Sequence, residues 1–160
     1  MGDMGKNTGL PLRLPKTTEA KLPNLRKSGY KVTSHESPLY NCVAYAAGDM
    51  KNKWQNGCAP LPGYYWPPSA LQSSLIEGLE SAFAAIKYVR CAGYEPEQGY
   101  EKIALYADAY GIWTHAAIQR KDGSWSSKLG NSYDIRHKNP HSMIGPEYGY
   151  VMCYMSRKKK

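Results

Sequence analysis

The pattern of apolar residues predicts the longest helix of the chain between Ser69 and Tyr88. Apolar side chains recur there every four positions: Leu71, Leu75, Leu79 and Phe83. This spacing places them on one face of a helix, which we interpret as a core-facing stripe rather than a cofactor site. A second helix is predicted from Tyr100 to Tyr110, where Gly111 ends it.

The other apolar runs favour β-structure and predict an antiparallel sheet. A hairpin is expected from a strand over residues 112–119, a turn at Asp122-Gly123 and a return strand that starts near Trp125. A short strand is expected at residues 89–91, and a last strand at residues 149–155 beside the first strand of the hairpin. Helices that precede an antiparallel sheet indicate an α+β fold.

A short, Ala-rich helix is predicted to begin at a cysteine. Ser37-Pro38 forms a turn, Asn41 is a favoured N-cap residue, and Cys42 falls in the first helical turn. Unpaired backbone N–H groups and the helix dipole favour negative charge there, so we expect the pKa of the thiol to be lowered and the nucleophilic thiolate to be accessible. A buried, purely structural Cys42 is the alternative interpretation.

His115, in the first strand of the hairpin, is the candidate base for this thiol. The small residues that follow it leave room for a helix to pack against the strand. Ser127 on the return strand is expected to touch the imidazole from the side away from Cys42 and to fix its tautomer. His137 is the other candidate for this third position.

These residues resemble the papain-like cysteine peptidases and amidases, most of all their NlpC/P60 branch. The shared order is a Cys at a helix start, a strand with His and small residues, and a hairpin to a strand with a polar residue. The local motifs Ser-Pro-x-Tyr-Asn-Cys, Tyr-Trp-Pro, His-Ala-Ala and Trp-Ser-Ser-Lys-Leu-Gly are more similar to a little-characterised family of bacterial domains of unknown function. The resemblance covers residues 37–155. It departs from the NlpC/P60 pattern at Asn41, where Asp is usual, and at Ser127, where His is usual.

The resemblance implies a papain-like domain whose nucleophile helix packs on the antiparallel sheet. We expect a cysteine hydrolase that cleaves a peptide or amide bond through an acyl-enzyme, with Cys42 as nucleophile and His115 as base. Ser127, or failing it His137, would orient the imidazole. Deamidases, thioesterases and acyltransferases use the same dyad and stay open as alternatives.

The remaining site residues are predicted from their positions near these groups. The backbone N–H of Cys42, assisted by the side chains of Asn41 and Tyr40, is expected to hold the oxyanion. The Pro-, Gly- and aromatic-rich segment 51–69 is expected to fold over the cleft. Four residues are candidates for the cleft wall: Tyr65, Trp66, Trp125 and Lys128. No cofactor or metal is expected, because the four cysteines lack zinc-type spacing.

Charge along the 160 residues suggests an alternative function. The net charge is +8, and it is concentrated at the ends: residues 1–34 carry seven Lys or Arg and two acids, and residues 157–160 carry four bases. We expect an extended, basic, Pro-containing arm over 1–34, one domain over 35–156 and a basic tail over 157–160. The alternative is a catalytically inactive binding module whose basic ends contact nucleic acid or a partner protein.

The compartment is expected to be the cytoplasm. The sequence has no apolar signal segment and no run of membrane-spanning length, and free thiols fit a reducing setting. We therefore expect a cytoplasmic monomer; export by a leaderless route is the alternative.

Overall fold

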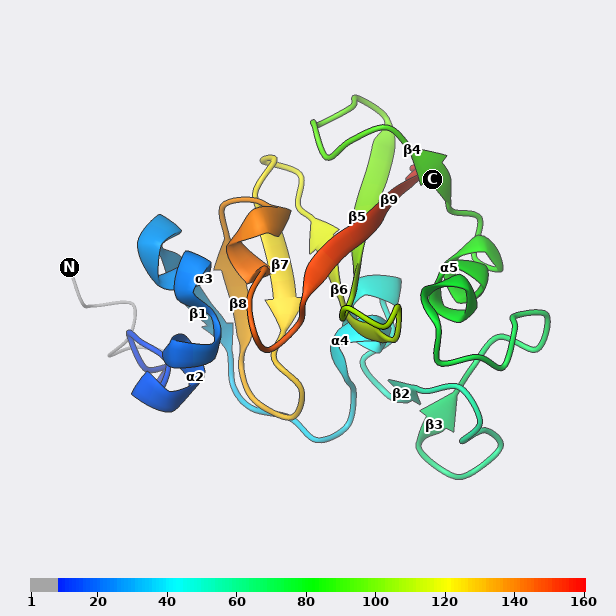
Figure 1. Ribbon diagram of the computed structural model, residues 1–160, viewed down its shortest axis with the longest axis horizontal. Coiled ribbons are helices and arrows are strands. Elements are labelled where there is room, and N and C mark those ends of the chain that lie inside the picture. The colour runs from blue at the N-terminus through cyan, green and yellow to red at the C-terminus, as the bar shows by residue number, and fades with distance from the viewer. Residues whose placement is uncertain (1–8) are drawn as a thin grey trace.

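A computed structural model describes residues 9–160, which form a seven-stranded sheet with helices on both faces (Figure 1). With the labels of Figure 1, the helices are α2 (Lys16–Lys21), α3 (Pro23–Ser28), α4 (Cys42–Ala47), α5 (Ile76–Ala84) and the 3-10 helix η1 (Pro140–Met143). The strands are β1 (Tyr30–Ser34), β2 (Lys53–Trp54), β3 (Tyr64–Tyr65), β4 (Val89–Cys91), β5 (Tyr100–Ala107), β6 (Trp113–Gln119), β7 (Trp125–Lys128), β8 (Asp134–His137) and β9 (Tyr150–Lys158).

The sheet has the strand order β1-β8-β7-β6-β5-β9-β4, and each pair of neighbours is antiparallel. The short strands β2 and β3 form a separate parallel pair. The predicted α+β class with an antiparallel sheet is therefore confirmed, as is the hairpin formed by β6 and β7.

Two apolar cores cover the two faces of the sheet. Leu105 of β5 points into one core, together with α4 and α5, and its neighbour Tyr106 points into the other, together with Leu22 and Leu25 of the N-terminal helices. Alternate side chains of a strand face opposite sides, so a strand in the middle of the sheet needs apolar residues on both.

The prediction of a helix over residues 100–110 is wrong, because these residues form β5. Ile103 to Ala107 are all fully buried, on both faces of the strand. This continuous burial suits a strand covered on both sides, and it overrides the helix propensity of the sequence. β5 also separates β9 from β6, so the last strand does not lie beside the strand of His115 as predicted.

The helix predicted from Ser69 is shorter than expected and begins at Ile76. The residues before it are engaged by the chain that leads into β6: Ile76 N–H donates to Gly111 O over 2.8 Å, and Trp113 N–H donates to Ser74 O over 3.0 Å. The second half of the predicted stripe, Leu79 and Phe83, is fully buried.

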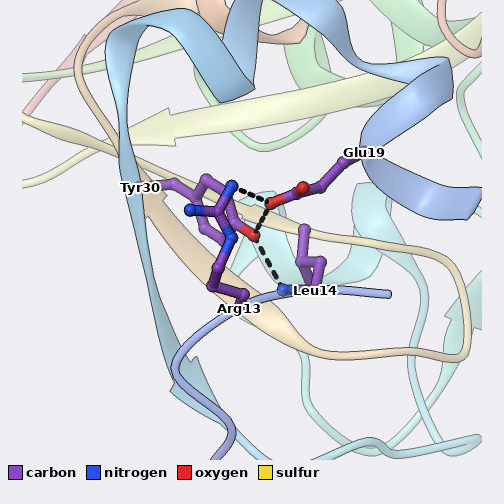
Figure 2. A network of polar contacts seen from close by, with 4 residues as sticks. All are labelled: Arg13, Leu14, Glu19 and Tyr30. Carbon is purple, nitrogen blue, oxygen red and sulfur yellow. Dashed lines mark hydrogen bonds and ion pairs between the residues drawn. The ribbon is translucent and has the colours of Figure 1, made fainter. Parts of the chain in front are cut away.

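The N-terminal segment is not an extended arm over residues 16–34, where the structure has α2, α3 and β1. Figure 2 shows a polar network that fixes it: the Tyr30 hydroxyl donates to Glu19, Arg13 forms an ion pair with Glu19 at 2.8 Å, and Leu14 N–H donates to the Tyr30 hydroxyl over 2.7 Å. Residues 1–8 of the predicted arm lie outside the described residues.

The predicted basic tail is in part a strand, since β9 continues through Lys158. Arg157 forms an ion pair with Glu101 at 2.9 Å, and its guanidinium lies 4.5 Å from the centre of the Tyr88 ring. Within residues 9–160, no helix combines the length and the apolar character needed to cross a bilayer.

Candidate functional site

Cys42 is the first residue of α4, as predicted. The side chain of Asn41 caps the helix by accepting from Ala44 N–H over 3.0 Å, and Gly48 ends it with a φ of 87°, which a side chain would disfavour. Tyr45 N–H donates to Asn41 O, and the N–H groups of Cys42 and Val43, which have no partner within the helix, are directed toward the Cys42 sulfur.

The thiol of Cys42 lies at the edge of β6, where that strand separates from β7. Within the described chain, β6 and β7 pair only at Ile118 with Ser126 and at Gln119 with Trp125. The Sγ atom lies 4.0 Å from Thr114 O, in the part of β6 beyond this pairing. The sulfur therefore contacts backbone that belongs to the residues on either side of His115.

Burial raises the pKa of Cys42 to about 11, which corrects the lowered pKa predicted from the helix start. Desolvation of the thiolate is the main cause, because only 8% of the residue is exposed. Hydrogen bonds from the backbone N–H groups of Ala116, Val43 and Cys42 and the charge of Lys128 act in the opposite direction, and are weaker. At neutral pH the resting side chain is a thiol.

His115 is fully buried and begins a chain of side-chain hydrogen bonds. Its Nε2 lies 3.0 Å from Ser127 Oγ, which lies 2.8 Å from His137 Nε2. The other ring nitrogen of His137, Nδ1, lies 3.0 Å from Asn139 O. Both candidates for the third position, Ser127 and His137, thus belong to one chain, with Ser127 in contact with His115.

The carbonyl at the end of this chain fixes its proton positions. Burial lowers the pKa of His137 to about 4 and lowers that of His115 well below its ordinary value, so both rings are neutral at pH 7. Asn139 O accepts only, so His137 carries its proton on Nδ1, and its bare Nε2 accepts from Ser127. Ser127 Oγ then accepts from His115 Nε2–H. It follows that His115 Nδ1 is unprotonated, and this buried atom has no hydrogen-bond partner within residues 9–160.

The ring of His115 lies on the sheet face opposite to the core of α4. It stacks on Tyr148, with ring centres 4.0 Å apart, and contacts Tyr106 edge-on. Cys42 belongs to the core on the other face and reaches β6 at its separation from β7. Within the described residues, no hydrogen bond joins Sγ to the imidazole in this resting arrangement.

The side chains of Asn41 and Tyr40, predicted to assist the oxyanion, are engaged elsewhere. Asn41 Oδ1 accepts from Ala44 N–H and Trp54 N–H, and its Nδ2 donates to Trp54 O over 2.9 Å. The Tyr40 hydroxyl donates to Asp134 over 2.9 Å. Asn41 thereby joins the start of α4 to β2, and Tyr40 joins the residues before α4 to β8.

None of the predicted cleft-wall residues is among those that line the cavity at Cys42. Trp66 is buried against Trp113, and Trp125 is fully buried in the opposite core. Lys128 is also fully buried, with Nζ donating to Ser132 O and lying 4.9 Å from the centre of the Tyr40 ring. Tyr65 is in β3.

The cavity at Cys42 has a volume of about 270 Å³ and is covered by elements that the sequence did not suggest. Its walls come from α2, from the turn between β7 and β8, and from the segment before β9. The lining includes Thr17, Thr18, Lys21, Thr114, Ser132, Glu147 and Tyr148. Lys21 and Glu147 face each other with 3.9 Å between Nζ and Oε1. No local motif marks these positions, because they meet only in the folded chain.

No group of three or more His, Cys, Asp or Glu side chains within residues 9–160 is placed to hold a metal ion. In comparisons with known proteins, residues 31–156 match a family described as a domain of unknown function (DUF7689). Neither the curated proteins nor the solved structures include a significant match.

Proposed function

Because the chain belongs to the DUF7689 family, whose function is unknown, we propose its activity from the site itself: a cysteine-dependent hydrolase of peptide or amide bonds. Cys42 is the nucleophile, His115 the general base, and Ser127 with His137 the residues that orient the base. The arrangement of a nucleophile helix against an antiparallel sheet, with the base on the adjoining strand, also supports a papain-like relationship.

One observation carries this proposal. Thr114 O contacts the sulfur, and the next residue, His115, has a buried, unprotonated Nδ1 that finds no hydrogen-bond partner within residues 9–160. An unsatisfied polar atom in a protein interior is destabilising, so its persistence calls for an explanation. We explain it by a role in catalysis, in which His115 Nδ1 accepts the proton of Cys42. Ser127 holds the opposite nitrogen and thereby keeps Nδ1 free.

The raised pKa of Cys42 determines how the first step proceeds. The nucleophile is a thiol and not a preformed thiolate. Sγ therefore attacks the substrate carbonyl while its proton moves to His115 Nδ1. A thioester forms, and the leaving amine takes the proton from Nδ1. Water then hydrolyses the thioester with Nδ1 as base, which regenerates the thiol.

The geometry also provides an oxyanion site and a substrate cavity. The N–H groups of Cys42 and Val43, which point toward the sulfur in the resting structure, would donate to the oxyanion. The substrate carbonyl would enter through the cavity beneath α2. In the resting structure Sγ and the imidazole lie on opposite faces of the sheet, so the step requires a rearrangement of β6 and α4 that brings Nδ1 and Sγ within hydrogen-bond reach.

Acyl transfer from p-nitrophenyl acetate tests the proposal without knowledge of the natural substrate. We expect release of nitrophenolate and an acetyl thioester on Cys42, located by peptide mapping with mass spectrometry. Cys42→Ser should lower acylation by at least about 10³-fold, because the alcohol is a much weaker nucleophile. Cys153→Ser is the matched control, since Cys153 has the same exposed fraction of 8%, and it should react as the wild type does.

Acetyl groups found on Cys58 or Cys91, or unchanged nitrophenolate release in Cys42→Ser, would contradict the proposal. Both of these thiols are more exposed than Cys42, so they would react first if accessibility alone decided. That outcome would favour the binding module over the hydrolase.

A further inference from the structure

A second polar groove lies at the other end of the β6–β7 hairpin. Its volume is about 440 Å³, and it is lined by Ile118, Gln119, Arg120, Lys121, Asp122 and Arg136. Three of these six side chains are cationic and one is a carboxylate. The groove is separate from the cavity at Cys42, with which it shares no lining residue.

Arg136 is the central residue of this groove. It lies in β8 opposite Ser126 of β7, on the sheet face away from Ser127 and His137. Its Nε atom is buried and has no hydrogen-bond partner within residues 9–160. A guanidinium is always charged and presents its N–H groups as a planar fork; because Nε is shut off from solvent, a ligand in the groove would be bound by the terminal nitrogens of Arg136.

Arg120 brings a second guanidinium to the same place. Its Nη1 donates to Ser126 Oγ over 3.1 Å, and Ser126 is the cross-strand neighbour of Arg136. This contact holds one nitrogen of Arg120 and leaves its other donors available. Lys121 adds an exposed ammonium at the groove.

The carboxylate of the groove neutralises only part of this charge. Asp122 Oδ1 accepts from Ser124 N–H over 2.9 Å and from the Ser124 hydroxyl over 2.6 Å, which stabilises the turn of the hairpin. Hydrogen bonds from Ser124 chiefly lower the pKa of Asp122, so it is ionised at neutral pH. Three cations and one anion give the groove a charge of +2.

We propose that Arg120, Lys121 and Arg136 form a binding site for a phosphate group. Two guanidinium groups match the oxygens of phosphate in a bidentate manner, and the ammonium adds a point charge. The groove is open to solvent, so the phosphate can be free or part of a polynucleotide backbone. This site is distinct from the basic ends of the chain, of which Arg157 is paired with Glu101.

Fluorescence anisotropy with a short labelled oligothymidylate tests the proposal, and calorimetry with inorganic phosphate tests the free-anion source. We expect Arg136→Gln to weaken binding by roughly tenfold or more, as for loss of a hydrogen bond between charged groups. Arg120→Gln should weaken it similarly, and each substitution should reduce the slope of log K against log salt by about one. Arg136→Lys retains the charge without the fork and should have an intermediate affinity.

Two controls separate the groove from the general positive charge of the protein. Lys87→Gln removes an exposed cation between α5 and β4, and Lys159→Gln with Lys160→Gln removes the end of the chain. Neither should change the affinity by more than about twofold. Competition by inorganic phosphate identifies a free-phosphate site, whereas binding of the oligonucleotide alone identifies a backbone site; both support the proposal.

Absence of binding to either probe would overturn the inference. Equal weakening by Lys87→Gln or by the double substitution would also overturn it, because the interaction would then follow net charge and not the groove. Circular dichroism of each variant confirms that the hairpin has folded, and Arg136→Lys serves as the reporter if Arg136→Gln does not fold.

Discussion

Cys42 and Cys153 lie in two regions of the same core and differ in their surroundings rather than in their burial. Each is 8% exposed, and desolvation raises the pKa of each to about 11. Cys153 lies within β9, where it pairs with Leu105 of β5, one residue beyond the end of the pairing between β9 and β4 at Tyr154. Cys42 begins a helix at a place where two strands separate.

This difference shows that burial and pKa do not by themselves identify a nucleophile. The region of Cys42 has a helix start, a cavity and, on the opposite face of β6, an imidazole with a bare nitrogen. The charged neighbours of Cys153 are Glu80 and Arg90, which form an ion pair with each other at 2.6 Å. Substitutions that change the reactivity of the Cys42 thiol should therefore differ from those that change the reactivity of the Cys153 thiol.

The largest effect expected beyond that of Cys42→Ser concerns the base. His115→Gln should slow acylation of Cys42 by p-nitrophenyl acetate about 10²-fold, the lower end of the range for general-base catalysis, because no group remains to take the proton. Iodoacetamide labelling of Cys153, measured in the same variant by mass spectrometry, should be unchanged. Equal slowing at both cysteines would mean that the substitution alters the core and not the chemistry.

Acid should weaken the region of Cys42 before that of Cys153. The folded pKa of His137 is about 4, below the unfolded value of about 6.5, so the folded state favours the neutral ring. The neutral ring of His137 contributes fully to the free energy of unfolding above pH 6.5. This contribution is lost as the pH falls toward 4, and the free energy of unfolding decreases by about 3 kcal/mol in total. His115 acts in the same direction.

Urea unfolding at pH 7 and at pH 4.5 measures this loss, and hydrogen exchange locates it. We expect amides of β6, β7 and β8 to lose protection at pH 4.5 while those of β4 and β9 retain it. His137→Asn removes the titrating ring and should make the stability less dependent on pH. Uniform loss of protection in all strands would remove the distinction between the two regions.

The sequence predicted the parts of the site that depend on local chemistry. Asn41 is a cap because its side chain matches an N-cap, and Ser127 meets His115 because the hairpin turn sets the register of β6 and β7. The family resemblance led to the same residues. These features involve short separations along the chain.

The failures involve long-range packing. β5 has a helix-like composition, and its position between β6 and β9 decides its conformation. The pKa of Cys42 depends on how deeply α4 packs, which no motif encodes. Asn139 enters the hydrogen-bond chain through its backbone carbonyl, which every residue possesses, and α2 covers the cavity from more than 20 positions upstream of Cys42.

The smallest predicted effect alters the region of Cys153 alone. Glu80→Gln removes a carboxylate that raises the pKa of Cys153 and frees Arg90, whose charge lowers it. Iodoacetamide labelling of Cys153 at pH 8 should accelerate by roughly twofold to fivefold, the size expected when an exposed ion pair is changed. Labelling of Cys42 should stay constant, because its charged neighbour is Lys128 and not this pair. If Cys42 also reacted faster, the substitution would have loosened the core that the two cysteines share. The difference in reactivity between them would then be due to accessibility and not to their separate electrostatic surroundings.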